Sequence, residues 1–118
     1  MDMRYALVVV LFVSVLEACN SVSEPDRAPT ITGFIVAKDA PTSIGGPPTI
    51  HVKESAADPC GIIFLVRSST RVLRKSGGRL TEASQAALAV STPVSVWSGI
   101  VLTSCPGQAG AEVVEILS

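Results

Sequence analysis

The sequence predicts a small, mainly β domain: a barrel of five to six strands with one helix between the third and fourth strands. Short β-rich runs alternate with Gly- and Pro-rich turns from residue 30 onward. One segment alone, residues 80–90, has the composition of a helix. The chain of 118 residues has room for one domain.

The expected strands are bounded by turn-forming residues. They cover residues 30–38, 49–54, 62–67, 94–103 and 111–117, and residues 70–74 continue the third strand or form a short extra one. Alternation within residues 94–103 predicts two faces, one carrying Val94, Val96, Ile100 and Leu102 and the other Trp97 and Val101.

The expected helix follows these strands. Thr81 suits its N-cap, Glu82 suits its positive end, and four alanines favour helix. Its apolar side is expected to carry Leu80, Ala83, Ala87 and Leu88. The expected order is three strands, one helix and two strands, which is the order of elements in the OB-fold. A β-sandwich would need about seven strands. We therefore expect an OB-like barrel over residues 30–118.

The N-terminus carries a short apolar segment. No charge lies between Tyr5 and Leu16. About twelve residues are too few to span a bilayer, which takes about twenty, but they fit the apolar part of a signal peptide behind Arg4. Removal of residues 1–18 leaves eight Lys/Arg and eight Asp/Glu. A neutral chain has no long-range field to attract nucleic acid.

The four residues Leu16-Glu17-Ala18-Cys19 resemble the lipobox of bacterial lipoproteins, with Glu17 departing from the usual small or apolar residue. The resemblance implies a lipoprotein signal peptide over residues 1–18, lipid attachment at Cys19 and a flexible tether over residues 19–29. The chain would then face the periplasm of a bacterial envelope and bind the membrane through its lipid. Asn20, which is not an aspartate, favours the outer over the inner membrane.

An ordinary signal peptide, cut after Ser21 or Ser23, is the alternative. It predicts a secreted, unanchored β domain that binds a soluble ligand.

Cys60 and Cys105 remain as a pair once Cys19 is assigned to lipid. In an exported chain they predict one disulfide. A catalytic thiol or a zinc site would need His51, the only histidine, without the usual CxxC or HxxxH spacing. We expect no enzyme activity, metal or cofactor, and a thiol- or metal-dependent enzyme is the remaining alternative.

Five basic residues without an intervening acid form the main charge cluster: Arg67, Arg71, Arg74, Lys75 and Arg79. Two interpretations stay open, a solvated basic edge that resists aggregation and contact with anionic lipid headgroups or envelope polymers. An envelope protein is a further expected partner. Nucleic acid is not, because single-strand binding uses stacking aromatics and residues 19–118 contain only Phe34, Phe64 and Trp97.

The C-terminal third, VSVWSGIVLTSCPGQAGAEVVEI, is similar to the closing hairpin of small OB-like bacterial lipoproteins in domains of unknown function. The matching residues are Val94, Val96, Gly99, Val101, Ser104, Pro106, Gln108, Ala109 and Ala111, and Thr70-Arg71 matches a threonine-basic pair. Cys105 stands where an aromatic residue is expected. The resemblance covers residues 31–116 and implies a fold, with no established activity.

Overall fold

The computed structural model describes residues 22–41 and 46–117. The predicted signal peptide and Cys19 lie outside the described residues. The elements in chain order are β1 (Ile31–Asp39), β2 (Thr49–Lys53), β3 (Ile62–Leu65), β4 (Arg71–Ser76), β5 (Arg79–Glu82), the 3-10 turn η1 (Gln85–Ala87), β6 (Pro93–Ser98) and β7 (Gly107–Leu117). Over these described ranges, no helix is long and apolar enough to cross a membrane.

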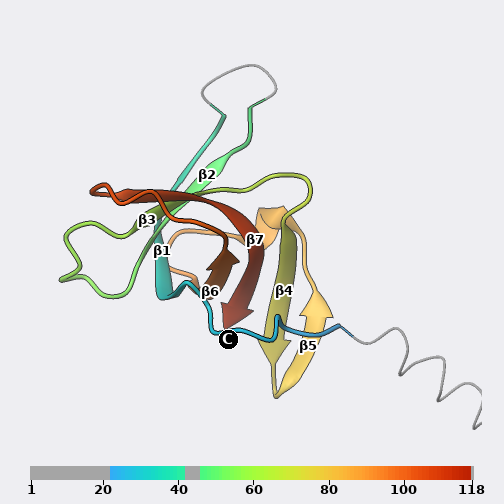
Figure 1. Ribbon diagram of the computed structural model, residues 1–118. Helices are drawn as coiled ribbons and strands as arrows, with labels where there is room; N and C mark the ends of the chain where they lie inside the picture. The colour runs from blue at the N-terminus through green and yellow to red at the C-terminus, as the bar shows by residue number, and fades with distance from the viewer. Residues whose placement is uncertain (1–21, 42–45, 118) are drawn as a thin grey trace, which may run out of the picture.

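Five strands form a closed barrel (Figure 1). β1, β2 and β3 pair as an antiparallel meander, and β6 pairs antiparallel with both β1 and β7. The barrel closes where β3 pairs in parallel with β7, from Ile62 opposite Gly107 to Leu65 opposite Gly110. Each barrel strand therefore has a partner on both sides, which removes the free edges that promote aggregation.

The two remaining strands, β4 and β5, form a hairpin attached to the barrel. β4 pairs in parallel with the second half of β7, and β5 pairs antiparallel with β4. Ser76 pairs with Arg79, so Gly77 and Gly78 alone form the turn, with φ of 60° and 79°. Two-residue hairpin turns favour glycine because they need positive φ.

The predicted helix over residues 80–90 is wrong. Residues 80–82 belong to β5, which is paired with β4, and only Gln85–Ala87 form a single 3-10 turn. The apolar side expected of the helix is partly retained, since Leu88 is buried in the barrel core with Ala83 and Ala87 packed against it. Of the two possibilities for residues 70–74, the short extra strand is confirmed as β4, and a continuation of the third strand is wrong because β3 ends at Leu65.

A β-bulge in β7 shifts, by one residue, which side chains of this strand face the core. Trp97 pairs with Val113 and Ser98 with Ala111, so Glu112 is the extra residue. Ala109 and Ala111 face the core before the bulge, as do Val114 and Ile116 after it. The bulge therefore turns Val113 and Glu115 to the outer face of the sheet.

The β6 strand is shorter than predicted. Val94 and Val96 face the core and Trp97 faces the other way, as expected. However, β6 ends at Ser98, and the side chains of Ile100 and Leu102 are 89% and 63% exposed in the loop that follows. Their predicted place on the inner face is wrong, because the chain leaves the sheet before reaching them.

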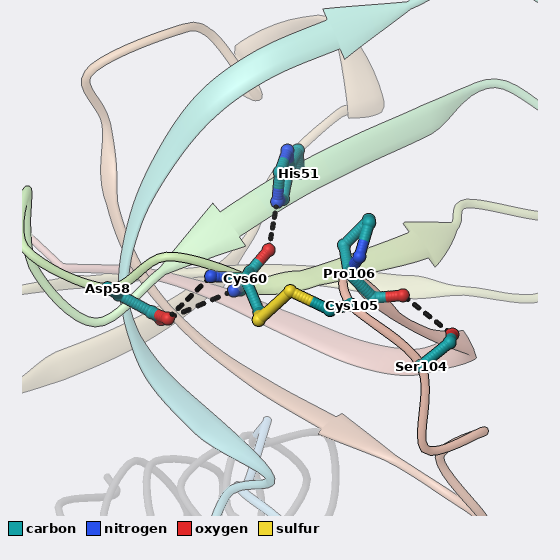
Figure 2. Close-up of a disulfide and its surroundings, with 7 residues drawn as sticks. His51, Asp58, Cys60, Ser104, Cys105 and Pro106 are labelled. Carbon is teal, nitrogen blue, oxygen red and sulfur yellow. Dashed lines mark hydrogen bonds between the residues drawn. A yellow bond between two sulfur atoms is a disulfide. The ribbon is translucent and has the colours of Figure 1, made fainter.

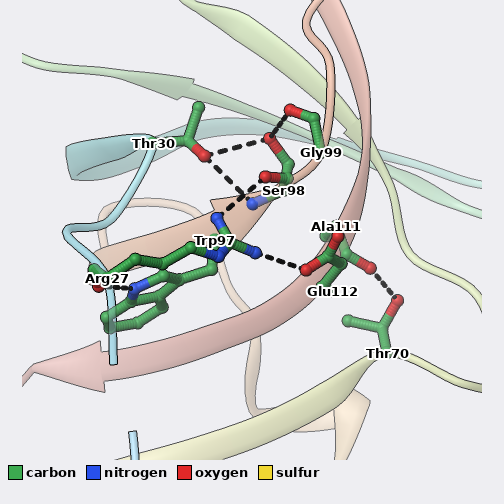
Figure 3. Close-up of polar contacts among 8 residues, drawn as sticks. All are labelled: Arg27, Thr30, Thr70, Trp97, Ser98, Gly99, Ala111 and Glu112. Atoms are coloured by element: carbon green, nitrogen blue, oxygen red, sulfur yellow. Dashed lines mark hydrogen bonds and ion pairs between the residues drawn. The ribbon is translucent and has the colours of Figure 1, made fainter. Parts of the chain in front are cut away.

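Thr70 joins the two strands that lie on the same edge of β7. Its buried hydroxyl donates to the Ala111 carbonyl oxygen at 2.7 Å (Figure 3) and accepts from the Arg67 amide at 2.9 Å. The hydroxyl thus satisfies a β7 carbonyl between the part of β7 paired with β3 and the part paired with β4.

Thr70→Val is expected to lower the free energy of unfolding by about 1–3 kcal/mol, because it leaves a buried carbonyl and an amide without their partner. Urea denaturation measures this loss. Thr81→Val on the exposed side of β5 is the matched control and should change stability by less than about 0.5 kcal/mol. Equal effects of the two variants would contradict the role given to Thr70.

Candidate functional site

A disulfide between Cys60 and Cys105 joins the β2–β3 loop to the β6–β7 loop (Figure 2). The Cα atoms lie 4.8 Å apart, within the range that a disulfide spans. The predicted pairing is therefore confirmed. Since the sulfurs bind each other, neither is available as a nucleophile or metal ligand.

Polar groups fix the loop around Cys60. Asp58 accepts backbone hydrogen bonds from Cys60 and Gly61, both at 3.1 Å, and from Glu54 at 3.2 Å. These bonds hold the pKa of Asp58 below its ordinary value of 3.8. The His51 ring nitrogen Nε2 lies 2.8 Å from the Cys60 carbonyl oxygen, to which it donates (Figure 2). His51 is thus oriented by a backbone group, and the described residues hold no cluster of three or more His, Cys, Asp or Glu suited to a metal ion.

The five basic residues are divided between three places. Arg71 and Lys75 lie on the same face of β4 as the buried Leu73. Arg74 and Arg79 lie on the opposite face of the β4–β5 hairpin. Arg67 lies in the β3–β4 loop, where its guanidinium passes over Gly110, so that a side chain at position 110 would require the guanidinium to move. The pleat of β4 therefore separates charges that are adjacent in the sequence.

A hollow lies between the β1–β2 loop, the β3–β4 loop and η1, at the end of β2 opposite the disulfide. It consists of two adjoining pockets of about 150 and 450 Å³, both lined by Pro48, Val66 and Gln85. Ile50 and Leu88 add core side chains to the smaller pocket. The floor of the smaller pocket is therefore apolar, whereas both polar and apolar groups line the larger pocket.

Two positively charged side chains line the hollow. Lys38 lines the smaller pocket and Arg67 the larger one, and none of the lining residues is acidic. The Gln85 side-chain amide donates to the Arg67 carbonyl oxygen at 2.7 Å, and the Val66 amide donates to the Pro48 carbonyl oxygen at 2.9 Å. These bonds hold the walls together, so the hollow can accept an apolar group with an anionic group at its rim.

The described part of the predicted tether lies against the outer face of the sheet. Trp97, with 3% of its surface exposed, packs with Leu73 and Val113 there, and Val22 covers them. The Trp97 indole donates to the Arg27 carbonyl oxygen at 2.7 Å (Figure 3). The Arg27 guanidinium donates to the Ser98 carbonyl oxygen at 3.1 Å and forms an ion pair with Glu112. The outer face is thus a second, smaller apolar cluster covered by the chain itself.

Glu115 is buried on this outer face, with 1% of its surface exposed, and its Oε1 has no hydrogen-bond partner. Burial raises its pKa from the ordinary 4.5 to about 7, helped by a hydrogen bond and the charge of Glu24, while Lys75 acts in the opposite direction. Ionising Glu115 in this buried place costs free energy. The charge of Glu115 is therefore sensitive to pH near neutrality.

Comparisons with protein-family models, curated proteins and solved structures found no match. Fold and geometry together define a small closed β-barrel with a disulfide at one end of β2 and an apolar, positively rimmed hollow at the other. The resemblance of the closing hairpin to envelope lipoproteins stays a prediction.

Sequence reasoning missed the hollow and the covered outer face. Lys38 and Gln85 are 47 residues apart in the sequence and meet only in the folded chain, so no local sequence signal indicates their contact. A signal for the outer face did exist: Trp97 and Val113 are apolar residues on the side away from the core. Such residues indicate that something covers that side.

The Cys60→Ala/Cys105→Ala variant is expected to lose up to about 4 kcal/mol of unfolding free energy, the chain-entropy value for a loop of this length. The disulfide spans 45 residues, so its loss greatly enlarges the unfolded ensemble. Chemical denaturation measures the loss. Cys19→Ala is the control and should leave stability unchanged. A loss below about 1 kcal/mol would show that the disulfide adds little to the closed barrel.

Proposed function

We propose that this protein is a non-catalytic, lipid-anchored OB-like domain of the bacterial envelope that binds a small amphipathic anion in its hollow. The observation that carries the binding role is the hollow itself, with an apolar floor and two cations, Lys38 and Arg67, at its rim. Binding sites of this kind combine apolar walls with a few polar groups that fix orientation.

The strand order supports the OB-like assignment. Counting barrel strands alone, β1, β2 and β3 form the meander, and β6 and β7 are the fourth and fifth strands of a five-stranded barrel. The β4–β5 hairpin and η1 lie between the third and fourth barrel strands, the position of the OB-fold helix. Leu88 after η1 enters the core, as a capping helix would at that end.

Two features support the envelope location. The Leu16–Cys19 segment resembles a lipobox, and Cys60 and Cys105 form a disulfide, which persists in oxidising compartments. Arg71, Arg74, Lys75 and Arg79 are an additional surface for anionic envelope polymers or headgroups, on two faces of one hairpin. An envelope protein could occupy the same surface.

Lipid attachment is tested by expressing the full chain and its Cys19→Ala variant with a fatty-acid analogue. The full chain is expected to take up label and to appear in the membrane fraction, and Cys19→Ala to lose both. Label on Cys19→Ala, or an unlabelled full chain in the soluble fraction, would contradict the anchor and favour the secreted alternative.

Ligand binding is tested by NMR titration of the ¹⁵N-labelled protein with hexanoate, hexanol and inorganic phosphate. Hexanoate should shift the amides of Ile50, Val66 and Leu88 and should bind more tightly than the other two probes, because only it matches both floor and rim. Lys38→Gln or Arg67→Gln should weaken binding about two- to fivefold, the worth of one exposed ion pair.

Arg79→Gln is the matched control, since Arg79 lies on the hairpin and does not line the hollow. It should leave hexanoate affinity unchanged. Shifts confined to residues outside the hollow, or equal affinity for hexanoate and hexanol, would overturn the proposed site.

A further inference from the structure

We infer that residues 22–29 form a pH-controlled strap: it covers the outer face while the buried carboxyl of Glu115 holds a proton, and it detaches when this carboxyl is charged. Detachment would uncover an apolar strip made of Leu73, Leu80, Trp97 and Val113. The occupant of this strip is the protein's own N-terminal segment.

The strap ends at residue 29, because the Thr30 amide donates to the Val96 carbonyl oxygen and the Thr30 hydroxyl accepts from the Ser98 amide. The other contacts lie near the two ends of the strap. Near residue 27 it is held by the Trp97 indole hydrogen bond, by the Arg27 hydrogen bond to the Ser98 carbonyl oxygen and by the ion pair with Glu112. Near residue 22 it is held by Val22 on the apolar cluster and by Arg71, whose guanidinium donates to the Ser23 carbonyl oxygen at 3.5 Å. Most of these groups are exposed at the surface, where an ion pair is worth about 0–1 kcal/mol. A modest repulsion is therefore enough to release the strap.

Glu115 supplies the force for release, because it is buried on this face and its Oε1 has no hydrogen-bond partner, which makes its charged form costly. Glu24 of the strap adds to this cost, since its charge raises the pKa of Glu115. In the described part of the chain, the other charged groups of the strap and of this face are Asp26 and Arg27 of the strap, Arg71 and Lys75 of β4, Glu82 of β5 and Glu112 of β7. Lys75 favours the ionised form of Glu115, but burial and Glu24 outweigh it, since the net shift of the pKa is upward.

The direction of the pH effect follows from linkage. Detachment brings Glu115 into water and away from Glu24, which returns its pKa toward 4.5, whereas in the docked state the pKa is about 7. The docked state therefore holds the proton more tightly. Docking is strongest below pH 4.5, weakens as the pH rises to about 7, and changes little above that.

Release would change the reach of the anchor, a consequence that rests on the proposed lipid attachment. Cys19 precedes Val22 by three residues, so a docked strap keeps the barrel close to the lipid. The freed segment of residues 22–29 can extend to a length of about 28 Å. The strap would thus set the height of the hollow above the membrane according to pH.

Trp97 is the only tryptophan and reports directly on the strap. In the purified protein, its emission should move to longer wavelength and its acrylamide quenching should rise severalfold between pH 5 and pH 8, while the far-UV circular dichroism of the barrel stays constant. The shift in the pKa of Glu115 corresponds to a decrease in the equilibrium constant for docking of the strap, on the order of 50-fold between pH 5 and pH 8.

Glu115→Gln removes the titrating group and should keep Trp97 in its buried state up to pH 8. Glu24→Gln should move the transition to lower pH, because it removes the charge of Glu24. Glu54→Gln, in the β2–β3 loop and outside the strap and the face it covers, should leave the transition unchanged. An emission spectrum independent of pH, the same transition in Glu115→Gln, or a parallel loss of circular dichroism would overturn the proposal. None of these measurements needs lipid or ligand, so their failure leaves the anchor and hollow experiments standing.

Discussion

The parallel pairing of β3 with β7 is the contact on which the rest of the structure depends. It joins residues about 45 positions apart and turns an open sheet into a closed barrel. Its first pair, Ile62 opposite Gly107, follows the disulfide by two residues on each strand. A slip of one residue would turn Phe64 out of the core, so the disulfide fixes the register as well as reducing the entropy of the unfolded chain.

The strands were largely predictable from the sequence, and the helix was not. Alternation and turn residues located β1, β2 and β3 to within two residues, and the start of β6 to within one, because those signals are local. Residues 80–90 failed because alanine content is a weak preference that pairing can override. Gly77-Gly78 was the contrary signal: two glycines between runs that can pair favour a hairpin, and the partner of β5 was the neighbouring β4.

The candidate sites divide in the same way. The cysteine pair followed from counting cysteines, and the structure confirms it. The basic cluster looked continuous in sequence, but a strand sends successive side chains to opposite faces, so Arg74 was separated from Arg71 and Lys75. Lys38 and Arg67 come to the same hollow from distant segments, and the pairing of β1, β2 and β3 brings them together.

The bulge at Glu112 determines which β7 side chains enter the core and which lie on the outer face of the sheet. Without the extra residue, strict alternation from Ala111 would send Val113 and Glu115 into the core and Val114 and Ile116 outward. With it, the core receives two branched apolar side chains, and a carboxyl is placed on the outer face, where the N-terminal segment buries it. A carboxyl in the core would meet no partner and would cost several kcal/mol. On a face covered by a detachable segment, the same group can regain water, which is why burial there produces a response to pH.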